Sequence, residues 1–132
     1  MTQKTSENNS RPLSPHVFLY KWHITMAISI LHRITGCALV VGSFFLLAWL
    51  WAAAYSPACF SLIHDSFNTI IGRLVLVSWS LAFYFHFCNG IRHLFWDIGK
   101  GFEIKKADRS GYAVILFSAV LTLITWYAIL VL

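Results

Sequence analysis

Three long apolar stretches, separated by short polar segments, dominate the chain. The runs Ile34 to Ala54 and Tyr112 to Leu132 each hold about 21 residues without a formal charge, and a run of about 18 lies between Arg73 and Arg92. A helix needs about 20 apolar residues to cross a hydrocarbon layer of roughly 30 Å. The pattern therefore predicts an all-α integral membrane protein with three transmembrane helices, at about residues 24–54, 72–95 and 111–131, in a single domain covering residues 1–132.

Polar segments with helix breakers separate these predicted spans. Residues 1–20 are polar and contain prolines, which favours an irregular lead resting at the membrane surface or on a partner. The segment "YSPACFSLIHDSFN" is expected to end the first helix, with Pro57 as the breaker. The segment "DIGKGFEIKKADRSG", with its glycines and mixed charges, is expected to form an exposed loop.

Composition and charge agree with a membrane protein and give it an orientation. Hydrophobic residues make up 58% of the 132 positions and charged residues only 11%, a balance too apolar for a soluble domain of this size. The net charge of +5 comes mainly from two short segments that flank apolar runs, not from a basic stripe, so nucleic acid binding is not expected. By the positive-inside rule these segments face the cytoplasm or matrix, which puts the N-terminus inside; the basic residues are Lys4, Arg11, Lys21, Lys100, Lys105, Lys106 and Arg109.

The N-terminal segment bears on the compartment. "MTQKTSENNSRPLSPH" lacks the apolar centre of a secretory signal and the arginine-rich amphipathic pattern of a mitochondrial presequence. We therefore expect a protein of the bacterial inner membrane, or of the mitochondrial inner membrane if it is encoded in the organelle.

The first span begins with polar side chains that lipid disfavours. Ser29, His32 and Arg33 lie three and four positions apart, so they share one broad helix face. An arginine at the centre of a membrane helix costs about 2.5–3.5 kcal/mol, and less near the interface. Two interpretations stay open at this point. Either Arg33 extends to lipid phosphate while its neighbours pack between helices, or the three residues form a ligand site.

A histidine lies deep in the second span. His86 is about 9 Å deeper than Arg92 at 1.5 Å per residue, and its ring nitrogens need partners that lipid does not offer. Gly90, one turn further on, leaves room on nearly the same face for a flat, bulky group. The pair fits a cofactor site, but it also fits a glycine packing contact with His86 hydrogen-bonded to a neighbouring helix.

The predicted topology brings the two sets of residues together. Because the first helix runs outward and the second returns, Ser29, His32 and Arg33 share the inner half of the membrane with His86 and His93. A haem needs a nitrogen ligand at depth and cationic groups near water for its propionates. His86 and His93 are seven residues apart on one helix face, so they cannot ligate opposite sides of one haem. His32 could in principle supply the second axial ligand, but its place near the interface suits the propionates better, so this ligand is expected from another chain.

Three ordered motifs resemble a known family. "RPLSPHVFLY", "SILHRITG" and "HFCNGIRHLFWD" are similar to the cytochrome b anchor subunit of succinate dehydrogenase, respiratory complex II, of the mitochondrial and alpha-proteobacterial type, over essentially the whole chain. The resemblance implies a complex with a flavoprotein, an iron–sulfur subunit and a second small membrane anchor that completes the helical bundle. The two anchors would share one haem b, and the complex would reduce ubiquinone with electrons from succinate.

The resemblance also implies roles for individual residues. His86 would be the axial ligand of the haem iron from this chain. His32 and Arg33 would lie near the haem propionates, and Ser29 and Arg33 would line the ubiquinone site. Ubiquinone reduction needs hydrogen-bond donors for carbonyl oxygens on which charge develops, and a hydroxyl and a guanidinium supply them.

Two residues near the aqueous end of the second span have less specific roles. His93 and Asp97 lie in the matching "RHLFWD" segment, where they could relay protons. For Asp97, a surface carboxylate paired with Lys100 or Arg92 is the simpler interpretation.

The chain itself is not expected to act on succinate, because it holds neither a flavin motif nor a cysteine cluster for iron–sulfur ligation. Two other functions remain as alternatives. One is a purely structural anchor without haem, in which His86 only packs. The other is a small transporter or proton pathway, which three spans without a pair of broken helices support poorly.

Overall fold

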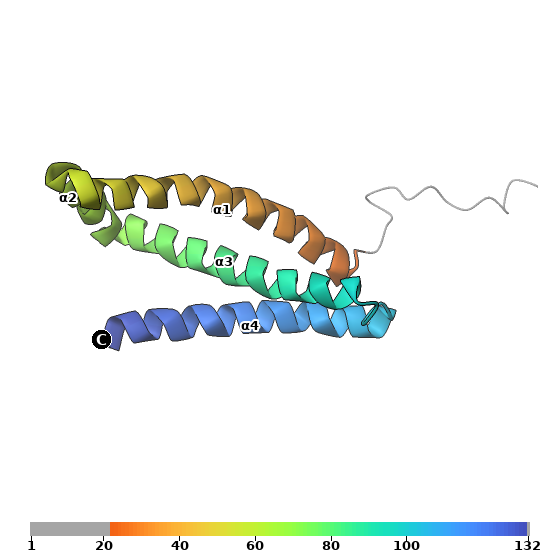
Figure 1. The fold of residues 1–132 in the computed structure, drawn as a ribbon. Coiled ribbons are helices and arrows are strands. Elements are labelled where there is room, and N and C mark those ends of the chain that lie inside the picture. Colours follow the sequence, from red (N-terminus) through yellow and green to blue (C-terminus); the bar gives the residue numbers. More distant parts are fainter. Residues whose placement is uncertain (1–21, 132) are drawn as a thin grey trace, which may run out of the picture.

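A computed structural model of the protein describes residues 22–131, which form four α-helices (Figure 1). They are α1 (Ile24–Tyr55), α2 (Pro57–Asn68), α3 (Ile70–Asp97) and α4 (Ile104–Val131). α1, α3 and α4 are each long and apolar enough to cross a membrane. The structure confirms an all-helical membrane fold with three candidate spans, and the inside location of the N-terminus stays a prediction.

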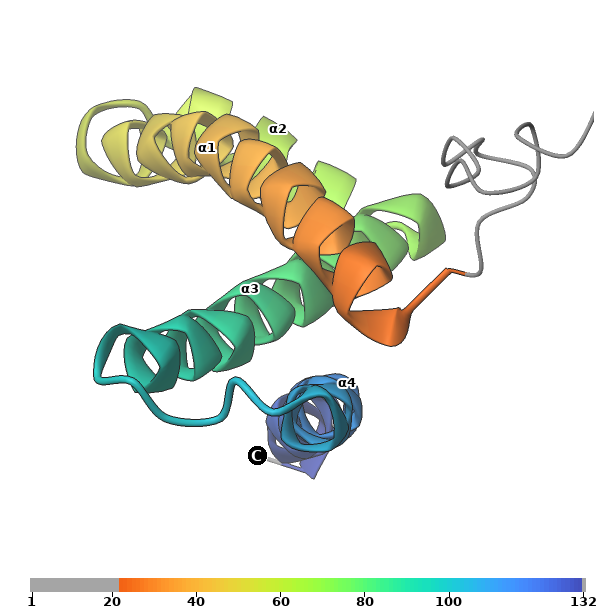
Figure 2. The same ribbon diagram turned by 90° about the vertical axis from the view of Figure 1, so that its right-hand side faces the viewer.

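The central helix of the arrangement is α3, which packs against both α1 and α4 (Figures 1 and 2). α1 and α3 run in opposite directions, joined at one end by the short α2, and α4 lies on the other side of α3. At the opposite end from α2, the beginning of α1 also reaches α4. There Gly111 of α4 faces α1, because a Cβ atom at this glycine would lie 2.6 Å from Cδ1 of Ile28.

The segment that was expected only to end the first span forms the short helix α2. Pro57 does end α1, but it also occupies the first turn of α2, a position that a proline favours because no backbone donor is needed there. Ser56 caps this helix, its hydroxyl accepting a hydrogen bond from the Cys59 backbone N–H at 3.4 Å. Thr69 caps α3 in the same way, accepting from the Gly72 backbone N–H at 3.0 Å.

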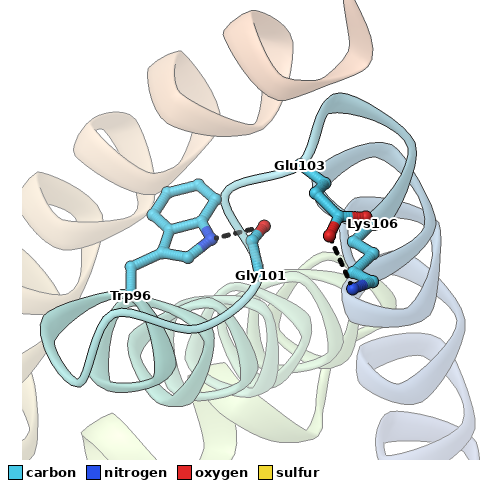
Figure 3. Close-up of polar contacts among 4 residues, drawn as sticks. All are labelled: Trp96, Gly101, Glu103 and Lys106. Atoms are coloured by element: carbon cyan, nitrogen blue, oxygen red, sulfur yellow. Dashed lines mark hydrogen bonds and ion pairs between the residues drawn. The ribbon is translucent and has the colours of Figure 1, made fainter.

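The last helix begins seven residues before the predicted span, at Ile104 rather than at residue 111. Its first turns are polar, and Lys106 forms an ion pair with Glu103 at 2.8 Å (Figure 3). Most of the segment expected as an exposed loop is therefore helical, and only residues 98–103 connect α3 to α4.

The connection between α3 and α4 is a tight turn held by an indole. Gly99 and Gly101 adopt φ angles of 77° and 87°, a region in which residues with a Cβ atom are strained. The indole Nε1 of Trp96 donates a hydrogen bond of 3.3 Å to the carbonyl of Gly101 (Figure 3). The turn therefore folds back over the end of α3.

The buried core is small and lies where α1, α3 and α4 meet. It consists of Ile28, Phe85 and Val114, with Ile24 and Cys88 packed against it. Elsewhere the three long helices expose many large apolar side chains, which lipid or other proteins must cover. The core therefore coincides with the part of the bundle that holds the predicted ligand residues.

Candidate site at the inner end of the bundle

Three histidines from two helices come together beside the core. The imidazole of His32 on α1 stacks on that of His86 on α3, with ring centroids 3.9 Å apart and planes 11° apart. The ring of His93, also on α3, lies 5.2 Å from that of His32 and is tilted by 46°. The structure thus places α1 and α3 in the antiparallel register that the sequence predicts for these residues.

Hydrogen bonding determines which nitrogen of His86 carries the proton. Nδ1 lies 3.2 Å from the backbone carbonyl of His32 and 3.3 Å from the hydroxyl of Thr35. A carbonyl oxygen can only accept, so this geometry assigns the proton to Nδ1 and leaves a lone pair on Nε2. Within residues 22–131, Nε2 has no recorded hydrogen bond. A histidine whose Nδ1 is fixed by a carbonyl and whose Nε2 is free has the form of a metal ligand.

A glycine on the facing helix makes room for the His86 ring. A Cβ atom at Gly36 would lie 3.1 Å from Cε1 of His86, closer than ordinary van der Waals contact. Gly90, the glycine singled out from sequence, has nothing within 4 Å of such an atom and borders open space. The close contact to His86 therefore comes from α1. Spacing along one helix could not reveal it, because it depends on how two helices face each other.

The other residues predicted on α1 are more accessible. Ser29 and Arg33 are exposed, and His32 is half-buried with its Nδ1 atom buried and without a hydrogen-bond partner among the residues described. Many serines and threonines in these helices donate to a backbone carbonyl three or four residues back, as Ser80 and Thr122 do. Ser29 makes no such bond to any part of the chain from residue 22 to 131, so its hydroxyl is available.

A groove of about 350 Å³ runs between the beginning of α1 and the end of α3. Ser29 and His93, for which the sequence predicts different roles, both line it. Arg33 and Asp97 do not line it. The lining residues are Thr25, Met26, Ser29, Ile30, Asn89, Arg92, His93 and Trp96.

Comparison with known proteins shows the family to which the chain belongs. A sequence model described as succinate dehydrogenase/fumarate reductase transmembrane subunit matches residues 7–125. The chain belongs to this family. It is 43% identical over 118 residues to the succinate dehydrogenase cytochrome b556 subunit of Rickettsia felis, covering 89% of this chain and 92% of the relative. It is 40% identical over 116 residues to the cytochrome b556 subunit of Paracoccus denitrificans, covering 88% and 89%.

A mitochondrial relative extends the match. The succinate dehydrogenase cytochrome b560 subunit of Sus scrofa is 36% identical over 115 residues, covering 83% of this chain and 66% of the relative. Together with the three apolar helices, these matches confirm a membrane-bound cytochrome b-type subunit similar to alpha-proteobacterial and mitochondrial forms. They name no individual site residue, so the roles of the residues above remain predictions.

Arg92 was not identified from the sequence as a buried residue beside the site. Arg92, treated from sequence as a span boundary, is only 6% exposed. Its Nε donates to the hydroxyl of Ser110 at 2.9 Å, Nη1 to Oδ1 of Asn89 at 3.3 Å, and Nη2 to the carbonyl of Ala107 at 3.0 Å. Its guanidinium also lies 4.1 Å from the centre of the Trp96 ring. Arg92 therefore joins α3 to the first turns of α4.

The placement of Asp97 corrects one interpretation made from sequence. Asp97 is exposed at the end of α3, and no ion pair in the described chain joins it to Lys100 or Arg92. Because the donors of Arg92 point to α4 and to Asn89, this arginine is already occupied. The pairing considered for Asp97 is therefore wrong, and its part in proton transfer stays a prediction.

Proposed function

We propose that this chain is the haem b-binding anchor subunit of a succinate:ubiquinone oxidoreductase. It would assemble with a flavoprotein, an iron–sulfur subunit and a second membrane anchor, and it would perform no succinate chemistry itself. The observation that carries the haem assignment is the 3.2 Å contact from His86 Nδ1 to the carbonyl of His32, which leaves Nε2 free for iron. The second axial ligand would come from the second anchor.

The side chains around His86 fit a haem. Gly36 lets the imidazole lie close to α1, and the unpartnered Nδ1 of His32 is a buried donor or acceptor in need of a polar group. Haem propionates would supply such a group, with the exposed Arg33 as their cation. Within residues 22–131 no three His, Cys, Asp or Glu side chains are grouped to hold a bare metal ion. A haem needs fewer protein ligands than a bare metal ion, because its macrocycle supplies four nitrogens and the protein supplies only the axial ligands.

The bound haem would supply one-electron redox chemistry, and the other residues would serve the quinone. Ser29 and Arg33 would donate hydrogen bonds to the ubiquinone oxygens, on which negative charge develops during reduction. His93, which lines the same groove as Ser29, could deliver protons that reach it from water through the exposed Asp97. Each role uses a group that the structure leaves accessible or unpaired.

The haem assignment is tested by His86→Ala in the intact complex purified from membranes. We expect loss of haem in a pyridine haemochrome assay, or loss of the bis-histidine absorption spectrum, because the imidazole nitrogen is removed. His64→Ala is the matched control, since His64 is exposed on α2 at the far end of the bundle and should leave haem content unchanged. An unchanged spectrum in His86→Ala would overturn the ligand assignment, whereas a wild-type complex without haem in the pyridine haemochrome assay would support the haem-free structural anchor.

Association with the soluble subunits is tested in the same preparation. Co-purification of a flavoprotein and an iron–sulfur protein with this chain is expected, with succinate-dependent reduction of an artificial acceptor. A chain that purifies without either protein would favour the transporter or proton-pathway alternative.

A further inference from the structure

The groove between α1 and α3 has a buried amide in its lining. Asn89 is 0% exposed, and its Oδ1 accepts a hydrogen bond from Nη1 of Arg92 at 3.3 Å. Because an arginine can only donate, this contact assigns the orientation of the amide, with oxygen towards Arg92 and Nδ2 away from it. Nδ2 is buried and has no hydrogen-bond partner among residues 22–131. A buried donor without an acceptor is unfavourable, so this atom calls for an oxygen that the chain does not supply.

Other uncommitted donors line the same groove. The hydroxyls of Thr25 and Ser29, one helical turn apart on α1, form no recorded hydrogen bond with the residues described. Three residues that line this groove of about 350 Å³ thus carry donors without a partner among the described residues, two hydroxyls and one buried amide N–H. A ligand that only accepts hydrogen bonds, through several oxygens on one ring, matches this set. A quinone head group has that chemistry.

The remaining walls suit an aromatic ring. Met26, Ile30 and Trp96 supply apolar surface, and Met26 is 37% exposed with a flexible side chain. Ligand pockets commonly combine such apolar walls with a few polar groups that determine orientation.

We propose that Asn89 is a substrate-binding residue whose Nδ2 donates a hydrogen bond to an oxygen of the quinone, on the α3 side of the groove across from Ser29. This inference rests on the proposed quinone function and adds a residue from the opposite helix. Arg92 then acts as a positioning residue, because its hydrogen bond to Oδ1 holds the amide with the donor towards the ligand. Two donors on facing helices would hold the ring in one orientation.

The test substitutes only the donor. Asn89→Asp keeps an oxygen for Arg92 and nearly the same volume, but it replaces Nδ2–H with an acceptor. We expect the KM for decylubiquinone to rise roughly five- to tenfold, the loss of about one hydrogen bond, with a smaller change in kcat. Haem content and succinate oxidation with phenazine methosulfate, which bypasses the quinone site, should stay unchanged. Asn68→Asp, an exposed residue at the end of α2, is the matched control and should leave the KM unchanged.

Parallel variants separate the possible failures. Asn89→Leu removes both polar atoms of the amide and should raise the KM for decylubiquinone at least as much as Asn89→Asp does. It serves as the test variant if the complex with Asn89→Asp does not assemble. If Ser29→Ala raises the KM while both Asn89 variants leave it unchanged, the role of Asn89 is refuted and the quinone site stands. If none of the three raises the KM, the proposed quinone site itself is wrong. Loss of phenazine activity and haem in both Asn89 variants would make this residue structural and overturn the inference.

Discussion

Arg92 gives the sharpest prediction about what holds the inner end of the bundle together. It is a buried cation that forms no ion pair among the described residues, although the negative charge of Asp108 acts on it; its direct contacts are neutral acceptors and one aromatic face. If the directed hydrogen bonds matter more than the charge, Arg92→Lys should be nearly as damaging as Arg92→Met. A lysine keeps the charge but lacks the planar fork that reaches three acceptors at once.

The contacts of Arg92 set the size of the effect. Its three hydrogen bonds have a charged donor and each contribute about 1.5 kcal/mol or more net, and the contact with the Trp96 ring adds roughly 0.5–2 kcal/mol. Removing the guanidinium recovers part of the cost of burying a charge, which offsets some of this loss. We therefore expect Arg92→Met to destabilise the assembled protein by about 3 kcal/mol and Arg92→Lys by about 2 kcal/mol.

Thermal unfolding of the complex in detergent measures this effect. A loss of about 3 kcal/mol corresponds to a Tm lower by roughly 10 °C for a chain of this length. Lys105→Met, an exposed lysine in the first turn of α4, is the control and should leave the Tm unchanged. An Arg92→Lys protein as stable as the wild type would refute the reasoning, because charge alone would then suffice. An equally stable Arg92→Met protein would show that desolvation cancels the whole network.

Two further contacts make predictions about the haem and about helix packing. Gly36→Ala should displace the His86 ring by a few tenths of an ångström, because the added Cβ would lie 3.1 Å from Cε1 of His86. We expect the protein to retain haem with a shifted absorption band or midpoint potential. An unaltered spectrum would contradict the contact. Tyr84→Phe removes the 2.7 Å hydrogen bond between the Tyr84 hydroxyl and Oγ1 of Thr125, which joins α3 to α4. It should destabilise the protein by about 0.6–1 kcal/mol, and a double-mutant cycle with Thr125→Val that shows no coupling in Tm measurements would speak against this bond.

The number of spans could be predicted from sequence because the thickness of the membrane sets the length of apolar run that a span needs. Each apolar run is long enough to span the bilayer, and its backbone must be helical there because lipid offers no hydrogen bonds. The ends of the helices were predicted less well than the number of spans. Hydropathy marks only the part in lipid, so the polar first turns of α4 were missed. Pro57 was interpreted as a breaker although proline also begins helices, and α2 was missed for that reason.

The site could be predicted only as far as it follows one helix. Helical spacing places Ser29, His32 and Arg33 on one face, and antiparallel topology brings that face to the level of His86. The contacts of Gly36 and of Asn89 depend on the rotation of α1 and α3 about their own axes, which the apolar pattern does not specify. Long helices that are apolar on nearly all sides carry little information about which side faces a neighbour.

The burial of Arg92 shows a second limit. An arginine at the end of an apolar run normally marks the interface with water, and the net charge pattern supported that interpretation. Its acceptors, however, come from Ser110 and Ala107, in a segment expected to be loop. Once that segment is helical and packs on α3, the guanidinium has partners inside the protein. The error in the position of one helix end thus produced the error about the arginine.

The polar groups at this end of the bundle are arranged at two depths along α3. His86 lies deeper, held by a backbone carbonyl of α1, while Asn89 and His93 lie three and seven residues nearer the end of the helix, the latter about 10 Å away at 1.5 Å per residue. His32 touches both levels, since its ring stacks on that of His86 and lies 5.2 Å from that of His93. In the proposed function, the deeper level holds the haem and the shallower one the quinone. His32, which contacts both levels, would then be the most direct connection in this chain through which occupancy of the quinone site could alter the haem site, or the reverse.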